Sequence, residues 1–240
     1  MGLSVAQGSI FVAYSALHEL SPEAADSLSR SEVERAEAFK SSKRQQEYVC
    51  ARALLRATLE RCTGNPASSH KLTTTEKGKP VCVDGPAVSI AHSGNLVVCA
   101  VTDRGEIGID IEAPGRQRNV RDIAANYYAE DESEWLATQP EDRFYMLWVL
   151  KEAWLKATGD GIAGGLGALQ CIVTPPDIKA RVDNDSLAAL SLYAVEDALV
   201  GLATTTAAHT RVVIVRWDPL VSRFDESHEF RLVAATSQPV

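Results

Sequence analysis

The sequence predicts an α+β fold, and two observations lead to this prediction. Helical spacing of apolar residues occurs in the stretches 31–62, 120–136 and 140–158. In each half of the chain, the helical regions are followed by a cluster of short strand-like runs. Because helices and strands are grouped along the chain instead of alternating one by one, an α+β fold is favoured over a doubly wound parallel sheet. The 240 residues are enough for one large domain or two small ones.

The N-terminal region predicts one strand followed by helices. Residues 9–16 form an apolar run typical of a strand, and Ser, Pro and Glu at 21–23 are a helix start. A second helix is expected to begin at Ser31, because Ser31 and Glu34 have the spacing of a capping box. The serine pair at 41–42 is a place where this helix can divide into two.

The next region predicts β-structure. Residues 71–101 are rich in strand formers, with a loop at 76–80. Two runs at 96–102 and 106–112 are separated by Asp, Arg and Gly at 103–105. A short Gly-containing connection between two such runs is a hairpin signal, so we expect a β-hairpin here.

A change in composition divides the chain. Residues 113–121 contain Pro, Gly and three Arg with few apolar side chains, as linkers do. We therefore predict an N-terminal half at 1–115 and a C-terminal half at 116–240. Helices are expected in the second half at 120–136 and 140–158, a glycine-rich loop at 159–167, and strands at 168–174, 189–195, 199–205 and 211–217.

Composition excludes several classes of protein. The net charge is −8, which disfavours general binding to nucleic acid because phosphates need a basic surface. No apolar stretch reaches the roughly 18 residues that suggest a membrane span, and the first ten residues do not have the pattern of a signal peptide. The five cysteines are an odd number without C-x-x-C spacing, so we expect neither a disulfide framework nor a zinc site, and a cytoplasmic location.

The pattern Gly-Ile-Asp-Ile-Glu at 108–112 is the first candidate for chemistry. On a strand, alternate residues share a face, so Ile109 and Ile111 would point into the core. Asp110 and Glu112 would then share the other face, with Cα atoms about 7 Å apart. Two carboxylates at this spacing can converge on a hard cation such as Mg²⁺. The alternative is a strand with a solvated acidic edge.

The segment 148–161, WVLKEAWLKATGDG, is the second candidate. Its apolar residues form one helical stripe, and Glu152 and Lys156 lie four residues apart on another face. One interpretation is an ordinary surface ion pair. The other is a half-buried pair with perturbed pKa values, because further apolar residues neighbour both side chains.

Two shorter features could bind anions. His92, Ser93 and Gly94 follow a strand, and the backbone N–H groups of such a turn can hold a phosphate. The alternative is a structural or exposed histidine. Lys77 and Lys79 flank a glycine in a loop that lacks the P-loop pattern, so a P-loop is excluded.

Basic residues also recur along the predicted helix 31–62. Arg44, Arg52 and Arg56 lie eight and four residues apart, close to a helical repeat. They could face an anion, or they could form a solvated face.

In chain order these pieces are GKP, SIAHSG, GIDIE and W-x-x-KEAWLKATGDG. This ordered set resembles the phosphopantetheinyl transferases of the large, Sfp-like class. The resemblance covers residues 44–161, half of the chain, and the length also fits that class better than the small holo-acyl-carrier-protein-synthase type. It implies a pseudo-dimer of two similar α+β halves, the phosphopantetheinyl transferase fold, with the site between the halves.

The resemblance also implies a reaction. Members of this class transfer the 4′-phosphopantetheine group of coenzyme A to a serine of an acyl or peptidyl carrier protein and release adenosine 3′,5′-bisphosphate. It implies that Asp110, Glu112 and Glu152 bind Mg²⁺, for which Mn²⁺ can substitute because it accepts the same oxygen ligands. Glu152, directly or through a metal-bound water, would take the proton of the serine. Lys156 would contact the pyrophosphate and stabilise the departing bisphosphate.

Several further residues are implied to contact coenzyme A or the metal. The contacts to coenzyme A phosphates would come from Lys77, Lys79, His92, Ser93, Arg52 and, as a weaker candidate, Arg44. Glu132, in the segment YYAEDESEW, is similar to a further acid of the family. One departure is Ala91, since many relatives have a serine before the histidine.

Two other functions use the same residues. A magnesium-dependent phosphohydrolase would act on nucleotides with water as the nucleophile, and a non-catalytic relative would only bind coenzyme A or a carrier. The expected partners are a carrier protein and coenzyme A, with neither nucleic acid nor membrane, and a pseudo-dimer can work as a monomer. Arg116, Arg118 and Arg121 could offer local positive charge to an acidic carrier, or form a solvated linker.

Overall fold

A computed structural model of the protein describes residues 8–115, 118–161, 165–182, 189–206, 211–227 and 230–236. The chain divides into two compact units. Unit 1 comprises Met1–Arg104 and Thr210–His228, and unit 2 comprises Gly105–His209 and Glu229–Val240. The boundary predicted between residues 115 and 116 lies within unit 2. The boundary between independently folding domains stays a prediction.

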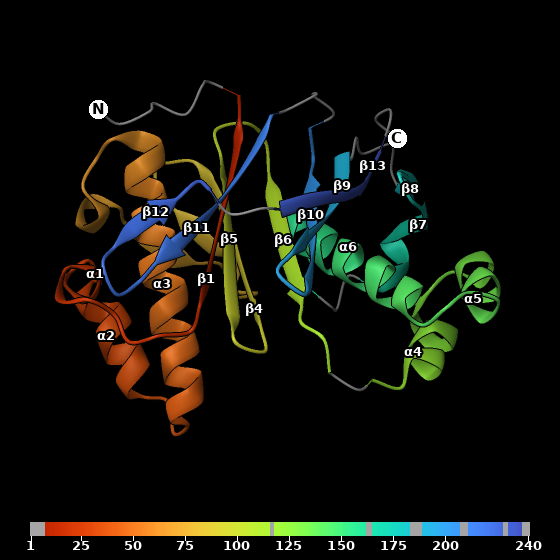
Figure 1. Ribbon diagram of the computed structural model, residues 1–240, viewed down its shortest axis with the longest axis horizontal. Helices are drawn as coiled ribbons and strands as arrows, with labels where there is room; N and C mark the ends of the chain where they lie inside the picture. The colour runs from red at the N-terminus through yellow and green to blue at the C-terminus, as the bar shows by residue number, and fades with distance from the viewer. Residues whose placement is uncertain are drawn as a thin grey trace. The chain divides into compact units, whose positions relative to one another are not determined.

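Unit 1 is a five-stranded sheet with helices on one face (Figure 1). The strand order is β12-β11-β1-β5-β4; β1 is parallel to β11, and the other neighbours are antiparallel. Helix α3 lies against the sheet, with α1 and α2 beside it. The elements are β1 (Ile10–Ala16), α1 (Pro22–Asp26), α2 (Arg30–Glu37), α3 (Ser42–Thr63), a 3₁₀ turn (Ala67–Ser69), the hairpin of β2 (Leu72–Thr74) and β3 (Pro80–Cys82), β4 (Ala87–Ser93), β5 (Leu96–Thr102), β11 (Val212–Asp218) and β12 (Arg223–Asp225).

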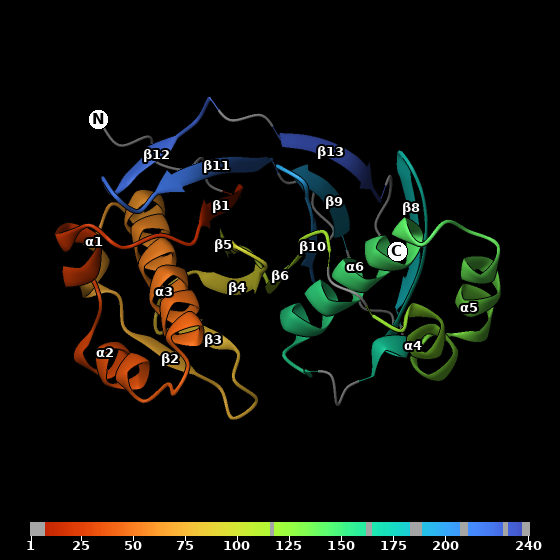
Figure 2. The ribbon, with the colours of Figure 1, turned by 60° about the horizontal axis from the view of Figure 1, so that its bottom comes forward.

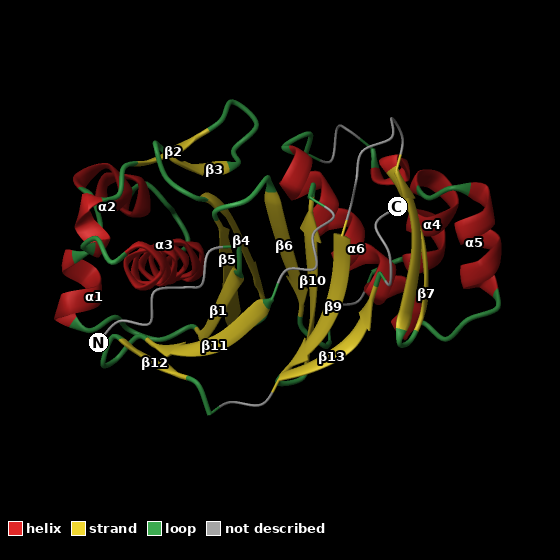
Figure 3. Ribbon diagram, turned by 90° about the horizontal axis from the view of Figure 1, so that it is seen from above, coloured by secondary structure: helices red, strands yellow, loops and turns green. Residues whose placement is uncertain are grey.

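Unit 2 is a six-stranded sheet in the order β6-β10-β9-β13-β8-β7, and α6 packs against it. Figures 2 and 3 show α4 and α5 side by side next to α6. In the described part of the chain, no helix is both long and apolar enough to span a membrane. The elements are β6 (Ile107–Glu112), α4 (Val120–Tyr127), α5 (Glu130–Ala137), α6 (Asp142–Thr158), a 3₁₀ turn (Leu166–Ala168), β7 (Leu169–Thr174), β8 (Asp177–Val182), β9 (Ala189–Val195), β10 (Ala198–Thr204) and β13 (Phe230–Ala235).

The two units repeat one plan. Each runs from a strand through three helices and a 3₁₀ turn to a pair of strands and then two more strands. The antiparallel trio β1-β5-β4 of unit 1 corresponds to β6-β10-β9 of unit 2. The prediction of an α+β fold made of two similar halves is therefore confirmed.

The repeat includes a buried ion pair. Glu32 in the first turn of α2 pairs with Arg56 of α3, at 2.7 Å, and Glu132 in the first turn of α5 pairs with Lys151 of α6, at 2.8 Å. Each cation also donates to a carbonyl of the following 3₁₀ turn. In both units, this pair fastens the short helix to the long one and to the turn beyond it.

The predicted hairpin of residues 96–102 and 106–112 is wrong. β5 pairs with β1 and β4, whereas β6 pairs with β10 in the other sheet. Both edges of β5 are taken within unit 1, so β6 finds its partner much later in the chain. A turn signal is local, and it does not show which strands have a free edge.

The helix boundaries also differ from those expected. The capping box is formed by Ser29 and Glu32 instead of Ser31 and Glu34, and Glu32 also accepts a hydrogen bond from Arg56. The predicted break is confirmed, with Ser41 capping α3. The stretch 120–136 forms two helices, α4 and α5, instead of one.

Two glycines allow α6 to lie directly on the sheet of unit 2. A Cβ atom on Gly108 of β6 would come within 1.8 Å of the carbonyl oxygen of Ala153, and one on Gly201 of β10 within 2.4 Å of that of Val149. No side chain fits at either position, because real Cβ atoms do not approach backbone so closely. Since alternate residues share a face, the face of β6 under α6 also carries Asp110.

We predict that Gly108→Ala destabilises unit 2 by about 3 kcal/mol or more, because the added methyl group meets helix backbone that has no room to move. Urea unfolding followed by circular dichroism measures the change. Gly167→Ala is the matched control, since its Cβ would meet nothing closer than 3.8 Å. A Gly108→Ala protein as stable as the wild type would refute this account of the glycine.

Candidate active site

Asp110 and Glu112 lie on the face of β6 that meets α6. Both are buried, with 8% and 6% of their surface exposed, although β6 is an edge strand of its sheet. Ile109 and Ile111 are buried as predicted. The alternative of a solvated acidic edge is therefore wrong, because the helix seated on Gly108 covers this face.

Helix α6 brings Lys156 to the first of these acids. Its Nζ donates to Oδ1 of Asp110 at 2.6 Å. The surface ion pair considered between Glu152 and Lys156 is not among the salt bridges of the described residues, because Lys156 turns toward the strand. The apolar stripe of the helix is confirmed, and its buried members include Leu147, Leu150, Trp154 and Ala157.

Glu152 lies half-buried beside the same acids. Its Oε1 is buried and has no hydrogen-bond partner within the parts of the chain that the structure describes. Burial raises the pKa of Glu152, and the charge of Asp110 raises it further. Lys156 and Arg118 lower this pKa, and Glu112 makes a smaller contribution that raises it. The five groups thus form one electrostatic cluster.

Arg118 is the second cation of this cluster, hereafter the acidic cluster. Its Nη2 donates to Oε2 of Glu112 at 2.8 Å, and its guanidinium lies 4.2 Å from the ring centre of Trp148. The side chain of Arg118 therefore turns inward. It is neither part of a solvated linker nor exposed as a docking charge, the two interpretations considered from the sequence. Arg121 is exposed on α4, and Arg116 lies outside the described residues.

The donor set of the acidic cluster fits a magnesium ion. Mg²⁺ prefers carboxylate oxygens, and Glu152 offers a buried oxygen that no donor of the described residues satisfies. As the described side chains stand, no group of three or more His, Cys, Asp or Glu residues is arranged to hold a metal ion. In this arrangement Lys156 pairs with Asp110, and Arg118 pairs with Glu112.

Glu132 lies elsewhere in unit 2, in the buried ion pair with Lys151. Its Oε1 accepts the backbone N–H of Cys171 at 2.6 Å, and its Oε2 accepts that of Ala129 at 3.0 Å. Lys151 also lies 4.6 Å from the ring centre of Tyr128. Both carboxylate oxygens of Glu132 are thus already hydrogen-bonded, so its predicted role as a further site acid would require breaking this network.

Unit 1 has a cavity of about 430 Å³ at which several predicted coenzyme A contacts meet. Arg44 and Arg52 enter its wall from α3, and His92 enters it from the end of β4. Arg56 is buried in the ion pair with Glu32 instead. The full lining is Phe39, Arg44, Glu47, Tyr48, Ala51, Arg52, Gly78, Pro80, Ile90 and His92.

One wall of this cavity combines aromatic rings with charge. The guanidinium of Arg52 lies 5.3 Å from the ring centre of Tyr48, which is itself 5.5 Å from that of Phe39. Nδ1 of His92 lies 3.8 Å from Oε2 of Glu47. Cations beside an aromatic wall suit a phosphorylated aromatic base.

The sequence reasoning missed Glu47, Tyr48 and Phe39. A helical count from Arg44 would have found the first two, because residues 44, 47, 48, 51 and 52 share one face of α3. Phe39 precedes α3, and no spacing rule connects it to that face.

The basic loop is placed at the rim of the same cavity. A turn from Thr75 to Lys79 is closed by backbone hydrogen bonds, with Gly78 at a φ of +87°. Gly78 and Pro80 line the cavity, and Lys77 and Lys79 flank Gly78. Ser93 is buried at the end of β4 and is not part of the lining.

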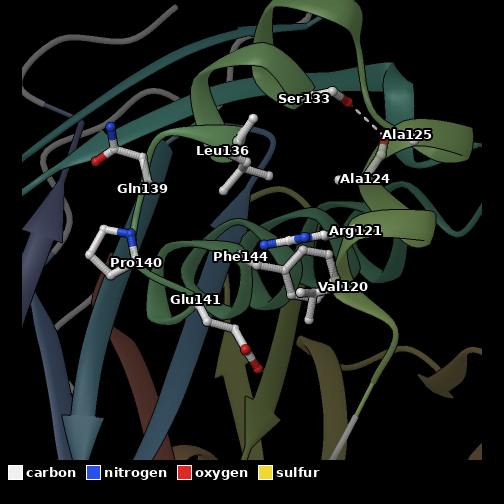
Figure 4. Close-up of a pocket in the computed structure, with 11 residues that line it drawn as sticks. Val120, Arg121, Ala124, Ala125, Ser133, Leu136, Gln139, Pro140, Glu141 and Phe144 are labelled. Atoms are coloured by element: carbon white, nitrogen blue, oxygen red, sulfur yellow. Dashed lines mark hydrogen bonds between the residues drawn. The ribbon is translucent and has the colours of Figure 1, made fainter.

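A larger cavity, of about 560 Å³, lies among α4, α5 and the start of α6. Figure 4 shows the residues that line it. Phe144 and Leu136 give it apolar walls, and Arg121 lies near Phe144. None of the predicted site residues lines it. Volume alone therefore does not identify the site.

Comparison with known proteins covers both units. Residues 32–102 match the family described as "4′-phosphopantetheinyl transferase N-terminal domain", and residues 106–205 match the "4′-phosphopantetheinyl transferase superfamily". The 4′-phosphopantetheinyl transferase HetI from Nostoc sp. is 32% identical over 162 residues, which are 64% of this chain and 68% of HetI. The chain belongs to the 4′-phosphopantetheinyl transferase superfamily. The resemblance inferred from the motifs is confirmed.

Two Bacillus phosphopantetheinyl transferases agree with this assignment. Psf-1 from Bacillus pumilus is 33% identical over 149 residues, 58% of this chain and 57% of that protein. Sfp from Bacillus subtilis is 35% identical over 117 residues, 46% of this chain and 50% of Sfp. The matched segments thus span between half and about two thirds of the relatives' own length. All residues of the acidic cluster lie within 106–205, the segment that matches the phosphopantetheinyl transferase superfamily.

We predict that Lys151→Met lowers the free energy of unfolding by about 3–5 kcal/mol, because it leaves the carboxylate of Glu132 buried and unpaired. The double variant Glu132→Leu/Lys151→Met should recover much of this loss, since it removes both charges. Chemical denaturation measures both. Glu134→Gln, at an exposed position of α5, the helix that carries Glu132, is the control. A loss below about 1 kcal/mol for Lys151→Met would contradict the structural role of the pair.

We also predict that Glu152→Gln stabilises the metal-free protein at neutral pH by up to about 1 kcal/mol, a value reduced by solvent screening because Glu152 is only half-buried. The folded state raises the pKa of Glu152. The wild type therefore keeps its full stability at low pH and loses some as the pH rises through that pKa. Thermal melting in EDTA across the pH range should show an advantage of the variant only at the higher pH values; an equal advantage at every pH would count against it.

Proposed function

We propose that the protein transfers the 4′-phosphopantetheine group of coenzyme A to a serine of an apo acyl or peptidyl carrier protein, in a magnesium-dependent reaction. The other product is adenosine 3′,5′-bisphosphate. The observation that carries the proposal is the acidic cluster, in which Asp110 and Glu112 from β6 meet Glu152 from α6. Membership of the phosphopantetheinyl transferase superfamily supports it.

The acids need a cation to act on this substrate. Coenzyme A carries a diphosphate, which three carboxylates alone would repel. A magnesium ion, when bound by Asp110, Glu112 and Glu152, neutralises the charge that develops on the leaving phosphate. Mn²⁺ suits the same oxygen ligands.

The transfer itself exchanges one phosphorus–oxygen bond for another. The serine oxygen bonds to the phosphorus that carries the pantetheine, and the bond from this phosphorus to the bridging diphosphate oxygen breaks. The bridging oxygen and its electron pair leave with the bisphosphate. Glu152 takes the serine proton, a role that suits a carboxylate with a raised pKa and an unsatisfied oxygen. Lys156 gives up Asp110 and donates to the departing bisphosphate.

Unit 1 binds the nucleotide end of coenzyme A in this proposal. Arg44, Arg52 and His92 in the cavity wall, with Lys77 and Lys79 in the loop at its rim, contact the phosphates. The aromatic wall at Tyr48 supports this assignment, because an adenine ring can lie against it. Ser93 is a weaker candidate, since its side chain is buried.

The proposed setting is a monomer in the cytoplasm. All five cysteines are free thiols, which agrees with a reducing compartment. The carrier protein is the expected macromolecular partner.

The test is mass spectrometry of purified apo carriers of the fatty-acid, polyketide and nonribosomal-peptide types, after incubation with the protein, coenzyme A and Mg²⁺. At least one carrier should gain the mass of one phosphopantetheinyl group, with release of an equal amount of bisphosphate. Free phosphate without any carrier would support the phosphohydrolase instead. Tight binding of coenzyme A without either product would support a non-catalytic relative.

We predict that Glu152→Gln abolishes turnover while the fold remains, because the amide cannot accept the serine proton. Wild-type kcat in this variant would reject Glu152 as the base.

His92→Ala should raise KM for coenzyme A about tenfold with little change in kcat, since one charge-assisted contact is lost. His18→Ala, at an exposed position outside the cavity lining, is the control. An unchanged KM in His92→Ala would remove His92 from the phosphate site.

A further inference from the structure

Arg118 is part of the acidic cluster, but it lies in none of the sequence motifs that predicted the acids of this cluster. It lies six positions after Glu112 in the sequence and returns to that residue, with Nη2 at 2.8 Å from Oε2. The side chain of Glu112 is 4% exposed and that of Arg118 is 16% exposed. At such burial, an ion pair is screened far less than one at the surface.

A second element fixes the guanidinium. Trp148, one helical turn before Glu152 on α6, places its ring centre 4.2 Å from Cζ of Arg118. A guanidinium over an indole is an attractive contact. Arg118 therefore connects the strand that carries Glu112 to the helix that carries Glu152.

The fit of Arg118 is incomplete. Its Nε is buried without a hydrogen-bond acceptor among the residues that the structure describes. An unsatisfied buried donor costs free energy. The site beside Glu112 thus holds the guanidinium of Arg118 without satisfying all of its N–H donors. This is expected for a site that a different cation can also occupy.

We propose that Arg118 is the resting counter-ion of Glu112 and competes with the divalent cation for that carboxylate. In the metal-free protein, the guanidinium pairs with Glu112 and holds this side chain in place between β6 and α6. When a divalent cation binds the acidic cluster, Arg118 leaves Glu112 and moves off Trp148. This inference rests on the metal site of the proposed function and adds a residue that sets its affinity.

Competition and a purely structural role predict opposite signs. If Arg118 only supported Glu112, its removal would loosen the acid and weaken cation binding. If Arg118 competes, its removal frees the carboxylate and strengthens cation binding. Lys156 is unsuitable for this test, because the proposed reaction uses it.

The experiment is a titration of the full-length, EDTA-treated protein with MnCl₂, with free Mn²⁺ measured by electron paramagnetic resonance. Arg118→Met should bind Mn²⁺ about tenfold more tightly than the wild type, as for the loss of one competing charge-assisted contact. Arg121→Met removes the same charge from an exposed position nearby and should stay within about twofold of the wild type. If Arg118→Met does not fold, as judged by circular dichroism, Arg118→Gln carries the same expectation.

Several results would overturn the proposal. Wild-type or weaker Mn²⁺ binding by the Arg118 variant would do so, and so would equal tightening by Arg121→Met, which would show a general effect of net charge. Glu152→Gln distinguishes a failure of the proposed metal site from a failure of the proposed role of Arg118. If Mn²⁺ binding is lost in Glu152→Gln and unchanged in Arg118→Met, the metal site stands and the role of Arg118 falls. If Glu152→Gln binds Mn²⁺ like the wild type, or no protein binds it, both fall.

Tryptophan emission gives a second readout that does not depend on affinity. Saturating MgCl₂ should change the emission of the wild type, because the guanidinium leaves the indole of Trp148. Arg118→Met and Trp148→Phe should both lose this change. An unchanged wild-type emission, at Mg²⁺ concentrations shown by competition with Mn²⁺ to fill the site, would contradict the movement.

Discussion

The close contact between α6 and the glycine at position 108 is the constraint on which the acidic cluster depends. Because Gly108 has no side chain, the backbone of Ala153 lies directly on β6. The helix then covers the same face on which Asp110 and Glu112 stand, and its own Glu152 and Lys156 lie beside them. A sheet edge that would otherwise be solvated becomes a half-buried site, where charges act on one another with less screening.

The resting charges of the cluster follow from that burial. Lys156 pairs with Asp110 and Arg118 pairs with Glu112, while Oε1 of Glu152 has no hydrogen-bond donor in the part of the chain that the structure describes. One of the three acids therefore has a buried oxygen without a partner among the described residues, which costs stability and favours the entry of a cation. The buried pair of Glu132 with Lys151 differs, because both oxygens of Glu132 accept hydrogen bonds. This pair and the equivalent pair of Glu32 with Arg56 in unit 1 each hold a short helix against a long one.

Local patterns predicted much of the site, whereas the choice of partners depended on the fold. The period of two along β6 correctly placed Asp110 and Glu112 on one face, and the helical stripe correctly placed α6 against the core. The spacing of Glu152 and Lys156 is that of a helical ion pair, but the approach of β6 gives Lys156 the carboxylate of Asp110 instead. Arg118 was assigned to the surface because its contacts, Glu112 and Trp148, lie on two elements that no sequence pattern brings together. The hairpin of β5 and β6 failed for the same reason, since strand pairing is decided by distant parts of the chain.

The central claim is that Asp110, Glu112 and Glu152 bind one divalent ion together. Anomalous diffraction from crystals grown with MnCl₂ and coenzyme A tests it most directly. The account predicts a single manganese peak with an oxygen of each of the three acids at about 2.0–2.6 Å, and with Arg118 no longer on Glu112. A peak that leaves out Glu152, or crystals in which manganese occupies only other places, would contradict it.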